Sequence, residues 1–184
     1  MKKTILFAAL LLSVASLLQA QVLKTKDGVI YFNPNKDQKN TEYSAQTKEA
    51  TGVLDADKGT VALLVGMKTF HFNNALLEEH FNENYLHTNK FPNATYKGSL
   101  TGFNKDMLQK DGVYNLSSSG TVTMHGQSKP FNAPVILTIK GGTAVFKCVF
   151  NIKAKDHDIE IPALVQGKLL EATPLEATIS FKTK

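Results

Sequence analysis

The sequence contains a single cysteine, Cys148, among 184 residues, so no disulfide can form within one chain. Stability must therefore come from a hydrophobic core. Residues 21–184 are enough for one domain that buries roughly 70% of its unfolded surface. Cys148 shares one face of an alternating pattern with apolar residues, which favours a buried thiol over a reactive one.

The sequence also lacks the common catalytic and metal-binding motifs. No H-E-x-x-H zinc motif, Walker loop or dinucleotide fingerprint occurs. His80 and His87 would lie roughly 10 Å apart along a helix, too far to share one zinc ion. His157 lies between Asp156 and Asp158, which favours solvated charge over a catalytic triad. We therefore predict no catalytic residues, no metal site and no cofactor.

The one long hydrophobic run lies in residues 1–20, which read MKKTILFAALLLSVASLLQA. Two lysines, an apolar run and a final small residue are typical of a cleaved signal peptide, and the run is too short to remain as a stable membrane span. We therefore expect an exported protein, periplasmic or secreted. Cleavage would remove two of the 21 basic residues and none of the 16 acidic ones, so the net charge falls from +5 to +3. The remaining lysines are dispersed, which gives no support to a nucleic-acid partner.

Long helical patterns are nearly absent, and short alternating segments take their place. Apolar residues recur at every second position in residues 61–67, 122–124, 135–139, 144–152 and 175–181. A two-residue period is typical of half-buried strands. Asp57–Gly59, Asp111-Gly112 and Gly141-Gly142 are turn signals, the last two typical of tight hairpins. The expected strands are VIYF, the stretch around residues 43–54, and segments that begin near residues 60, 94, 113, 121, 135, 143 and 175. We therefore expect an all-β fold of eight or nine antiparallel strands, either a sandwich or a closed barrel.

One segment, residues 74–85, has helical spacing instead. Asn74 can cap its start, and Phe91-Pro92 prevent the helix from continuing far. Its apolar and aromatic face consists of Leu77, His80, Phe81 and Tyr85. The sequence therefore predicts a short helix across one end of the strands. If the strands close into a barrel, periodicity alone is compatible with both a filled core and a ligand cavity.

Two motifs resemble those of a known family. Residues 70–98 contain the pattern F-x-F-x-x-x-L-L-x-x-H-F-x-x-x-Y-L, followed by K-F-P-x-A-x-Y-x-G, and residues 120–129 read GTVTMHGQSK. Both motifs, with the ending IEIPALVQGKLLEATPLEATISF, resemble the YceI-like family of exported lipocalin-like proteins that bind polyisoprenoids. The front of the chain departs from the family pattern, since VIYF and EYSAQTKEATGVLD replace its usual histidine-bearing strands.

The resemblance implies a single antiparallel lipocalin-like β-barrel of about eight strands over residues 21–184, with a short helix capping one end. It also implies an apolar tunnel for a polyprenyl chain. The residues expected to bind the ligand are Val65, Met67, Phe70, Leu77, Phe81, Tyr85, Met124, Leu137, Phe146, Phe150 and Ile179. The residues expected to anchor the cap are His80, Phe91, Pro92 and His125, the two histidines through hydrogen bonds.

Three functions are compatible with the sequence. The preferred one is a non-catalytic carrier or sequestering protein for a long-chain isoprenoid or acyl lipid. The second is an envelope stress or interaction protein whose barrel is filled, by Phe146 and Phe150 for example, and whose partner is a protein. The third, least favoured, is an enzyme acting on a lipid or quinone through His80, His125 or Cys148. A homodimer, through barrel edges or an exposed Cys148, is also compatible with the sequence.

Overall fold

The computed structural model of this chain describes residues 21–183. The predicted signal peptide, residues 1–20, lies outside the described residues. The described strands are β1 (Val22–Phe32), β2 (Ala45–Asp55), β3 (Thr60–Gly66), β4 (His71–Phe72), β5 (Asn93–Thr101), β6 (Gly112–Met124), β7 (Gln127–Lys140), β8 (Thr143–Lys153) and β9 (Ala172–Lys182).

The helical elements between these strands are all short. The two α-helices are α1 (Ala75–His80) and α2 (Ala163–Gln166). The 3-10 helices are η1 (Met67–Thr69), η3 (Lys105–Gln109) and η4 (Ala154–His157), and α1 continues directly into a π-helical turn, η2 (Phe81–Tyr85). No helix within residues 21–183 has the length and apolar composition needed to cross a membrane.

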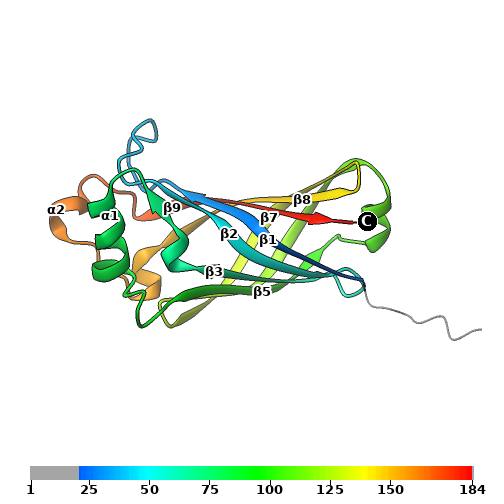
Figure 1. Cartoon of the computed structure of the whole chain (residues 1–184), viewed down its shortest axis with the longest axis horizontal. Helices are drawn as coiled ribbons and strands as arrows, with labels where there is room; N and C mark the ends of the chain where they lie inside the picture. The colour runs from blue at the N-terminus through cyan, green and yellow to red at the C-terminus, as the bar shows by residue number, and fades with distance from the viewer. Residues whose placement is uncertain (1–20, 184) are drawn as a thin grey trace, which may run out of the picture.

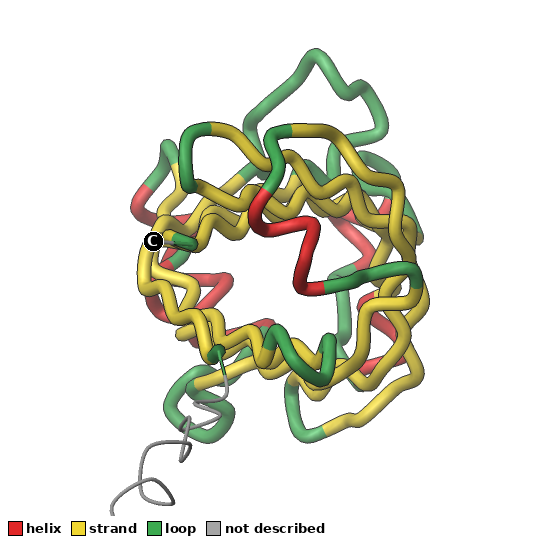
Figure 2. Tube along the Cα trace, turned by 90° about the vertical axis from the view of Figure 1, so that its right-hand side faces the viewer, coloured by secondary structure: helices red, strands yellow, loops and turns green. Residues whose placement is uncertain are grey.

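The strands close into one antiparallel barrel. Hydrogen bonding follows the order β1-β9-β8-β7-β6-β5-β3-β2, and β1 pairs with β2 to complete the ring. The short strand β4 pairs with the beginning of β2. Figure 1 shows the barrel from the side, and Figure 2 shows the strands as a ring seen end-on. The predicted lipocalin-like barrel of about eight strands is confirmed, and the sandwich is excluded.

The two-residue period positions the inward side chains as expected. In β7, Val135, Leu137 and Ile139 are at most 5% exposed, whereas Ile136 between them is 47% exposed. Residues 113 and 121, which the sequence suggested as the beginnings of separate strands, both lie in the single strand β6. That strand runs without a break through Ser117–Gly120 and pairs with β7 over its whole length.

Two of the three predicted turns are found. Gly141 and Gly142 join β7 to β8 with φ of 55° and 77°, the left-handed backbone that a tight type I′ hairpin requires. Asp57–Gly59 connects β2 to β3. The predicted hairpin at Asp111-Gly112 is wrong, because η3 precedes it and the connection from β5 to β6 is long.

The two ends of the barrel differ. α1 and α2 lie at one end, and the C-terminus lies at the other (Figure 1). The β5–β6 connection, which contains η3, supplies Leu108, 2% exposed, and the partly buried Phe103 and Met107 to the core. The barrel is therefore packed at the η3 end and covered only by short helices at the α1–α2 end.

Candidate ligand-binding cavity

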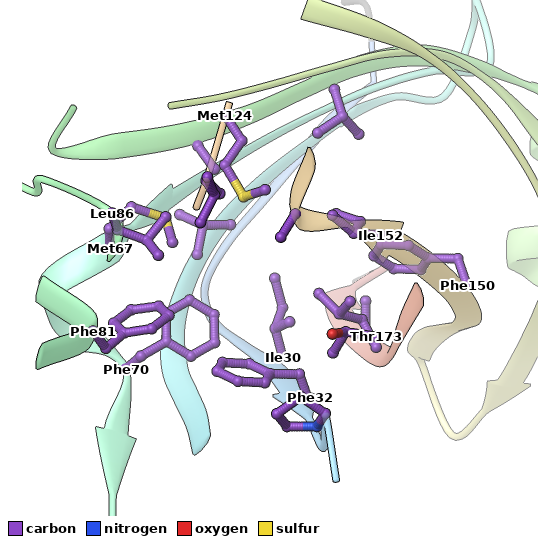
Figure 3. Close-up of a pocket in the computed structure, with 18 of the residues that line it drawn as sticks. Ile30, Phe32, Met67, Phe70, Phe81, Leu86, Met124, Phe150, Ile152 and Thr173 are labelled. Carbon is purple, nitrogen blue, oxygen red and sulfur yellow. The ribbon is translucent and has the colours of Figure 1, made fainter. Parts of the chain in front are cut away.

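The barrel encloses a cavity of about 1260 Å³. Its wall consists mainly of inward-facing apolar side chains from the barrel strands, together with residues of α1, η2 and α2. Figure 3 shows Met67, Leu86, Met124, Phe81 and Phe150 among the side chains that surround this space. Protein interiors leave few voids larger than a water molecule, so a cavity of this size is not a packing defect.

The cavity reaches the surface at the α1–α2 end. There its lining includes the exposed Lys36 and Glu171 and, in α2, Leu164, which is 89% exposed. Towards the η3 end the lining includes Leu54 and Phe181, which are 0% and 2% exposed. The cavity therefore has an open mouth at one end and a closed floor at the other.

Charged side chains are confined to the mouth. Lys155 and Glu171 both line it and form a hydrogen-bonded ion pair. This hydrogen bond lowers the pKa of the Glu171 carboxyl from its usual value. The pair is exposed, so it contributes little to stability. It does leave the mouth with both signs of charge rather than a cluster of one sign.

Four phenylalanines, from β1, β4, η2 and the residue before β4, hold the helical cap against the barrel. These residues, called here the phenylalanine cluster, are Phe32, Phe70, Phe72 and Phe81. Phe81 has the other three rings around it, with centroids at 5.1 to 5.9 Å. Aromatic pairs at these separations add to the free energy gained by burial alone. The cluster fixes η2 over the barrel end and forms part of the cavity wall.

Local hydrogen bonds determine where the cap begins and ends. The Asn74 side chain accepts a hydrogen bond from the Leu76 amide (2.9 Å), the N-cap predicted from the sequence. Glu78 Oε2 accepts a bond from the Phe72 amide (3.1 Å), which ties α1 to β4. The helical segment ends at Tyr85, and His87 follows with φ of 42°, a left-handed conformation that stops a helix. The helix therefore ends before Phe91-Pro92 is reached.

A pair of histidines attaches the end of the cap segment to the β6–β7 turn. His125 Nδ1 lies 2.9 Å from the His157 carbonyl oxygen. A carbonyl only accepts, so Nδ1 carries the proton in neutral His125 and Nε2 accepts from His87 Nδ1, also at 2.9 Å. His157 is 4% exposed and donates from Nδ1 to the Met124 carbonyl oxygen (3.3 Å). The prediction of a solvated His157 is therefore wrong.

Phe91 and Pro92 also contact the barrel near this turn. The Phe91 ring meets the His125 ring edge-on, with centroids 4.5 Å apart. The Pro92 carbonyl accepts a hydrogen bond from the Met67 amide (2.8 Å). These contacts place Phe91, Pro92 and His125 where an anchor of the cap segment would lie.

The structure places the residues predicted to bind a ligand as follows. Those that line the cavity are Val65, Met67, Phe70, Leu77, Phe81, Tyr85, Met124, Phe146, Phe150 and Ile179. Leu137 does not: it is 0% exposed in the hydrophobic core, paired with Phe146 across β7 and β8. His80 lines the cavity, and within residues 21–183 its side chain makes no hydrogen bond, so its role as a hydrogen-bonding anchor stays a prediction.

Several lining residues carry little or no signal in the sequence. Ile30 and Phe32 alternate in VIYF, so the parity of this segment could have identified them. Tyr96 and Ser118 are polar and gave no apolar signal. The α2 residues, such as Leu164, belong to a segment without periodicity.

Cys148 also lines the cavity, and burial raises its pKa to about 11. Its position on the inner wall gives no support to a disulfide between two chains.

Metal-binding side chains do not gather into a centre in the described part of the chain. Within residues 21–183, no three His, Cys, Asp or Glu side chains are arranged to hold a metal ion. His87 and His125 bond to each other, and the Nδ1 atoms of His125 and His157 are directed at backbone carbonyls. The histidine rings of this region therefore form hydrogen bonds with one another and with backbone carbonyls.

Comparisons with known proteins agree with this architecture. The model of the YceI-like domain matches residues 23–183. A polyisoprenoid-binding domain from Saccharophagus degradans, implicated in plant cell wall breakdown, has a TM-score of 0.74 at 13% identity, over 90% of this chain and 99% of that one. BcnA of Burkholderia cenocepacia has a TM-score of 0.68 at 13% identity, over 83% and 95%. The YCEI protein of Campylobacter jejuni has a TM-score of 0.60 at 15% identity, over 79% and 86%. A search of curated proteins found no match.

Proposed function

Because the chain belongs to the YceI-like family, we propose that it holds one long apolar ligand, of the isoprenoid or acyl type, in its barrel cavity. The observation that carries this proposal is the cavity of about 1260 Å³ with its open mouth. Ligand pockets usually measure about 300–1,000 Å³, so this one has room for a large molecule. The structural relative from Saccharophagus degradans is a polyisoprenoid-binding domain, which supports the same class of ligand.

The energetics favour a chain-like apolar ligand. The wall around the cavity is built largely of Phe, Leu, Ile, Val and Met side chains. Moving apolar surface from water into such an environment contributes about 2.5 kcal/mol for each 100 Å². A flexible chain can follow the barrel axis from mouth to floor and so bury most of its surface. Phe146 and Phe150 line the cavity without filling it, which argues against a filled barrel with only a protein partner.

The proposed role is non-catalytic. The one thiol on the cavity wall, Cys148, has a pKa raised to about 11 by burial, so it is a protonated, poor nucleophile at neutral pH. His125 is engaged in two hydrogen bonds, and His80 lies on the wall, where no hydrogen bond from residues 21–183 activates it. Holding a ligand requires only the apolar cavity and its mouth.

We further propose that the protein is exported, with cleavage after Ala20. The support is the order of lysines, apolar run and small residue in residues 1–20. The test is N-terminal sequencing of the protein from the envelope fraction of its own host. A chain that begins at Gln21 supports export. A chain that retains Met1 and fractionates with the cytoplasm overturns it.

Native mass spectrometry of the protein purified from its own host, followed by solvent extraction, tests the ligand proposal. We expect a stoichiometric lipid of defined mass. A bare protein that stays bare after incubation with isoprenoid and acyl lipids overturns the proposal and favours a protein partner.

A matched pair of variants sharpens this test. Ala94→Phe places a ring on the cavity wall, since Ala94 in β5 lines the cavity. Val113→Phe places the same ring on the outside of β6, where Val113 is 67% exposed. We expect the first variant to lose most of the bound lipid and the second to keep it. Equal retention in both would mean that the lipid binds elsewhere.

A further inference from the structure

Two hydroxyl groups face each other on the cavity wall, partway along the barrel. Tyr96 of β5 and Ser118 of β6 both line the cavity. The Tyr96 ring extends across Gly98, whose missing side chain leaves space for it: a Cβ at Gly98 would lie 2.1 Å from Tyr96 Oη. The hydroxyl oxygens of Tyr96 and Ser118 are 2.5 Å apart, which is a short hydrogen bond.

This pair is polar but almost completely buried. Tyr96 is 8% exposed and Ser118 is 4% exposed. Of the polar side chains that line the cavity within residues 21–183, these are the two that are more than nine-tenths buried. Aromatic rings lie beside the pair: Phe131 meets the Tyr96 ring edge-on at 5.1 Å and in turn meets Phe150 at 4.9 Å.

A count of protons shows that one hydroxyl is left without an acceptor. Each hydroxyl brings one O–H donor, and the bond between them uses one of the two. Within the described residues, neither oxygen has a further hydrogen-bond partner. One O–H therefore stays free beside the cavity, whichever of the two residues donates. Leaving a buried donor unsatisfied is unfavourable, and an acceptor on the ligand would remove that cost.

The surroundings determine the charge of the matching group. The lysines that line the cavity, Lys36 and Lys155, lie in the loop after β1 and in η4, at the mouth. A carboxylate or phosphate placed beside Tyr96 would have no cation there, and burying an unpaired charge is costly. Burial likewise raises the pKa of Tyr96, which keeps its hydroxyl neutral. A neutral oxygen acceptor accepts the free O–H and brings no unpaired charge into the cavity.

We propose that Tyr96 and Ser118 form a hydrogen-bonding site for a neutral carbonyl oxygen on the bound ligand. This inference rests on the proposed function, since it concerns a ligand in the same cavity, and it narrows the ligand class. The ligand is an apolar chain with a ketone, quinone, ester or amide carbonyl that lies inside the barrel. A plain hydrocarbon leaves the site empty, and an anionic head group stays at the mouth.

The test compares two probes that differ only in the carbonyl. They are a saturated terpenoid methyl ketone and the saturated hydrocarbon with the same carbon skeleton, each titrated by thermal shift. The variant is Tyr96→Phe with Ser118→Ala, because either hydroxyl alone could still donate to the ligand. The control is Thr123→Val with Ser128→Ala, which removes an exposed hydroxyl pair of similar length, 2.7 Å, at the β6–β7 hairpin.

We expect the cavity variant to bind the ketone about threefold to tenfold more weakly than the wild type does. Its affinity for the hydrocarbon should stay unchanged, and the control should bind both probes normally. The infrared carbonyl band of the bound ketone should lie at lower frequency in the wild type than in the cavity variant.

Two results would overturn the inference in distinguishable ways. If the hydrocarbon binds and the ketone affinity and carbonyl band are the same in the wild type and the cavity variant, the hydrogen-bonding site is wrong and the lipid-binding function stands. If neither probe binds the wild type, the proposed function fails, and the inference fails with it. A thermal melt of the cavity variant without probe verifies that it folds.

Discussion

Gly126 and Gly141 lie in two hairpin turns of the same barrel, and both have positive φ, 79° and 55°. An added Cβ at Gly141 would meet nothing within 4 Å, whereas at Gly126 it would lie 2.9 Å from Phe91 Cε1. The two glycines therefore have the same conformational requirement but different surroundings. Comparing them separates backbone strain from the packing of Phe91 on the turn.

We predict that Gly141→Ala lowers the free energy of unfolding by about 1–2 kcal/mol, through the left-handed backbone alone. Gly126→Ala should cost about 1–3 kcal/mol more, because Phe91 must move away from His125. Urea denaturation of the two variants measures the difference. Equal losses would show that the contact of Phe91 with this turn contributes nothing to stability.

Cys148 leads to a prediction about pH. Burial raises its pKa from 9.0 to about 11, so below pH 9 the thiolate fraction is about a hundredfold smaller than for a free thiol. We expect slow alkylation at neutral pH and a rate that rises with pH up to about 11. Bound lipid should slow the reaction further, because Cys148 lines the cavity.

The control for this experiment is the same protein in urea, where the exposed thiol should react at the ordinary rate. Iodoacetamide labelling followed by mass spectrometry gives both rates. Fast labelling of the folded protein at neutral pH, unaffected by lipid, would contradict the position of Cys148 on the inner wall.

At the scale of elements, the α1–η2 segment depends on Phe81 more than on its own hydrogen bonds. An isolated helix of this length is not stable in water, so the phenylalanine cluster must hold it. We predict that Phe81→Asp lowers the free energy of unfolding by about 3 kcal/mol or more, through the lost ring and the buried charge. Lipid retention should fall as well, since Phe81 lines the cavity.

Phe81→Leu is the matched control, because it keeps the position apolar and should retain most of the stability. Thermal melts and extraction of bound lipid measure the two effects. An unchanged melting temperature together with unchanged lipid retention in Phe81→Asp would contradict the role given to the cap.

The elements also show where sequence patterns are reliable. Alternation identified the inward residues of β7, β8 and β9, because each of these strands keeps a regular two-residue period. It found only the end of β1, because the pairing of β1 with β2 shifts register twice between Thr25 and Ile30, and each shift breaks the period. It divided β6 because Ser118 points inward, where a pattern search expects an apolar residue.

The candidate site was predictable to a similar degree. Parity indicates which side of the sheet a residue faces, but not its height in the barrel. Leu137 has the right parity and lies in the packed core, away from the cavity. His157 has acidic neighbours in the sequence, yet its ring is buried beneath the β6–β7 turn. Such positions depend on contacts between distant parts of the chain.

At the scale of the whole molecule, the proposed ligand should stabilise the barrel, because it would bind the folded state and has no cavity to enter in the unfolded chain. We predict an increase in the free energy of unfolding of about 2.7 kcal/mol when free lipid is at 100 times its Kd. Thermal melts across a lipid titration measure this increase, with Ala94→Phe as the control that should not respond. A melting temperature independent of lipid in both proteins would contradict binding in the cavity.

The closed floor of the barrel has one more consequence. Because the cavity has a single opening, the proposed ligand must enter and leave through the same mouth. The end of the ligand that enters first is therefore the last to leave. The depth of the cavity should also limit how long a ligand can be fully enclosed. Each added carbon of the proposed ligand should strengthen binding while there is still depth to fill, and once its tip reaches Leu54 and Phe181, every further carbon should be left outside in water.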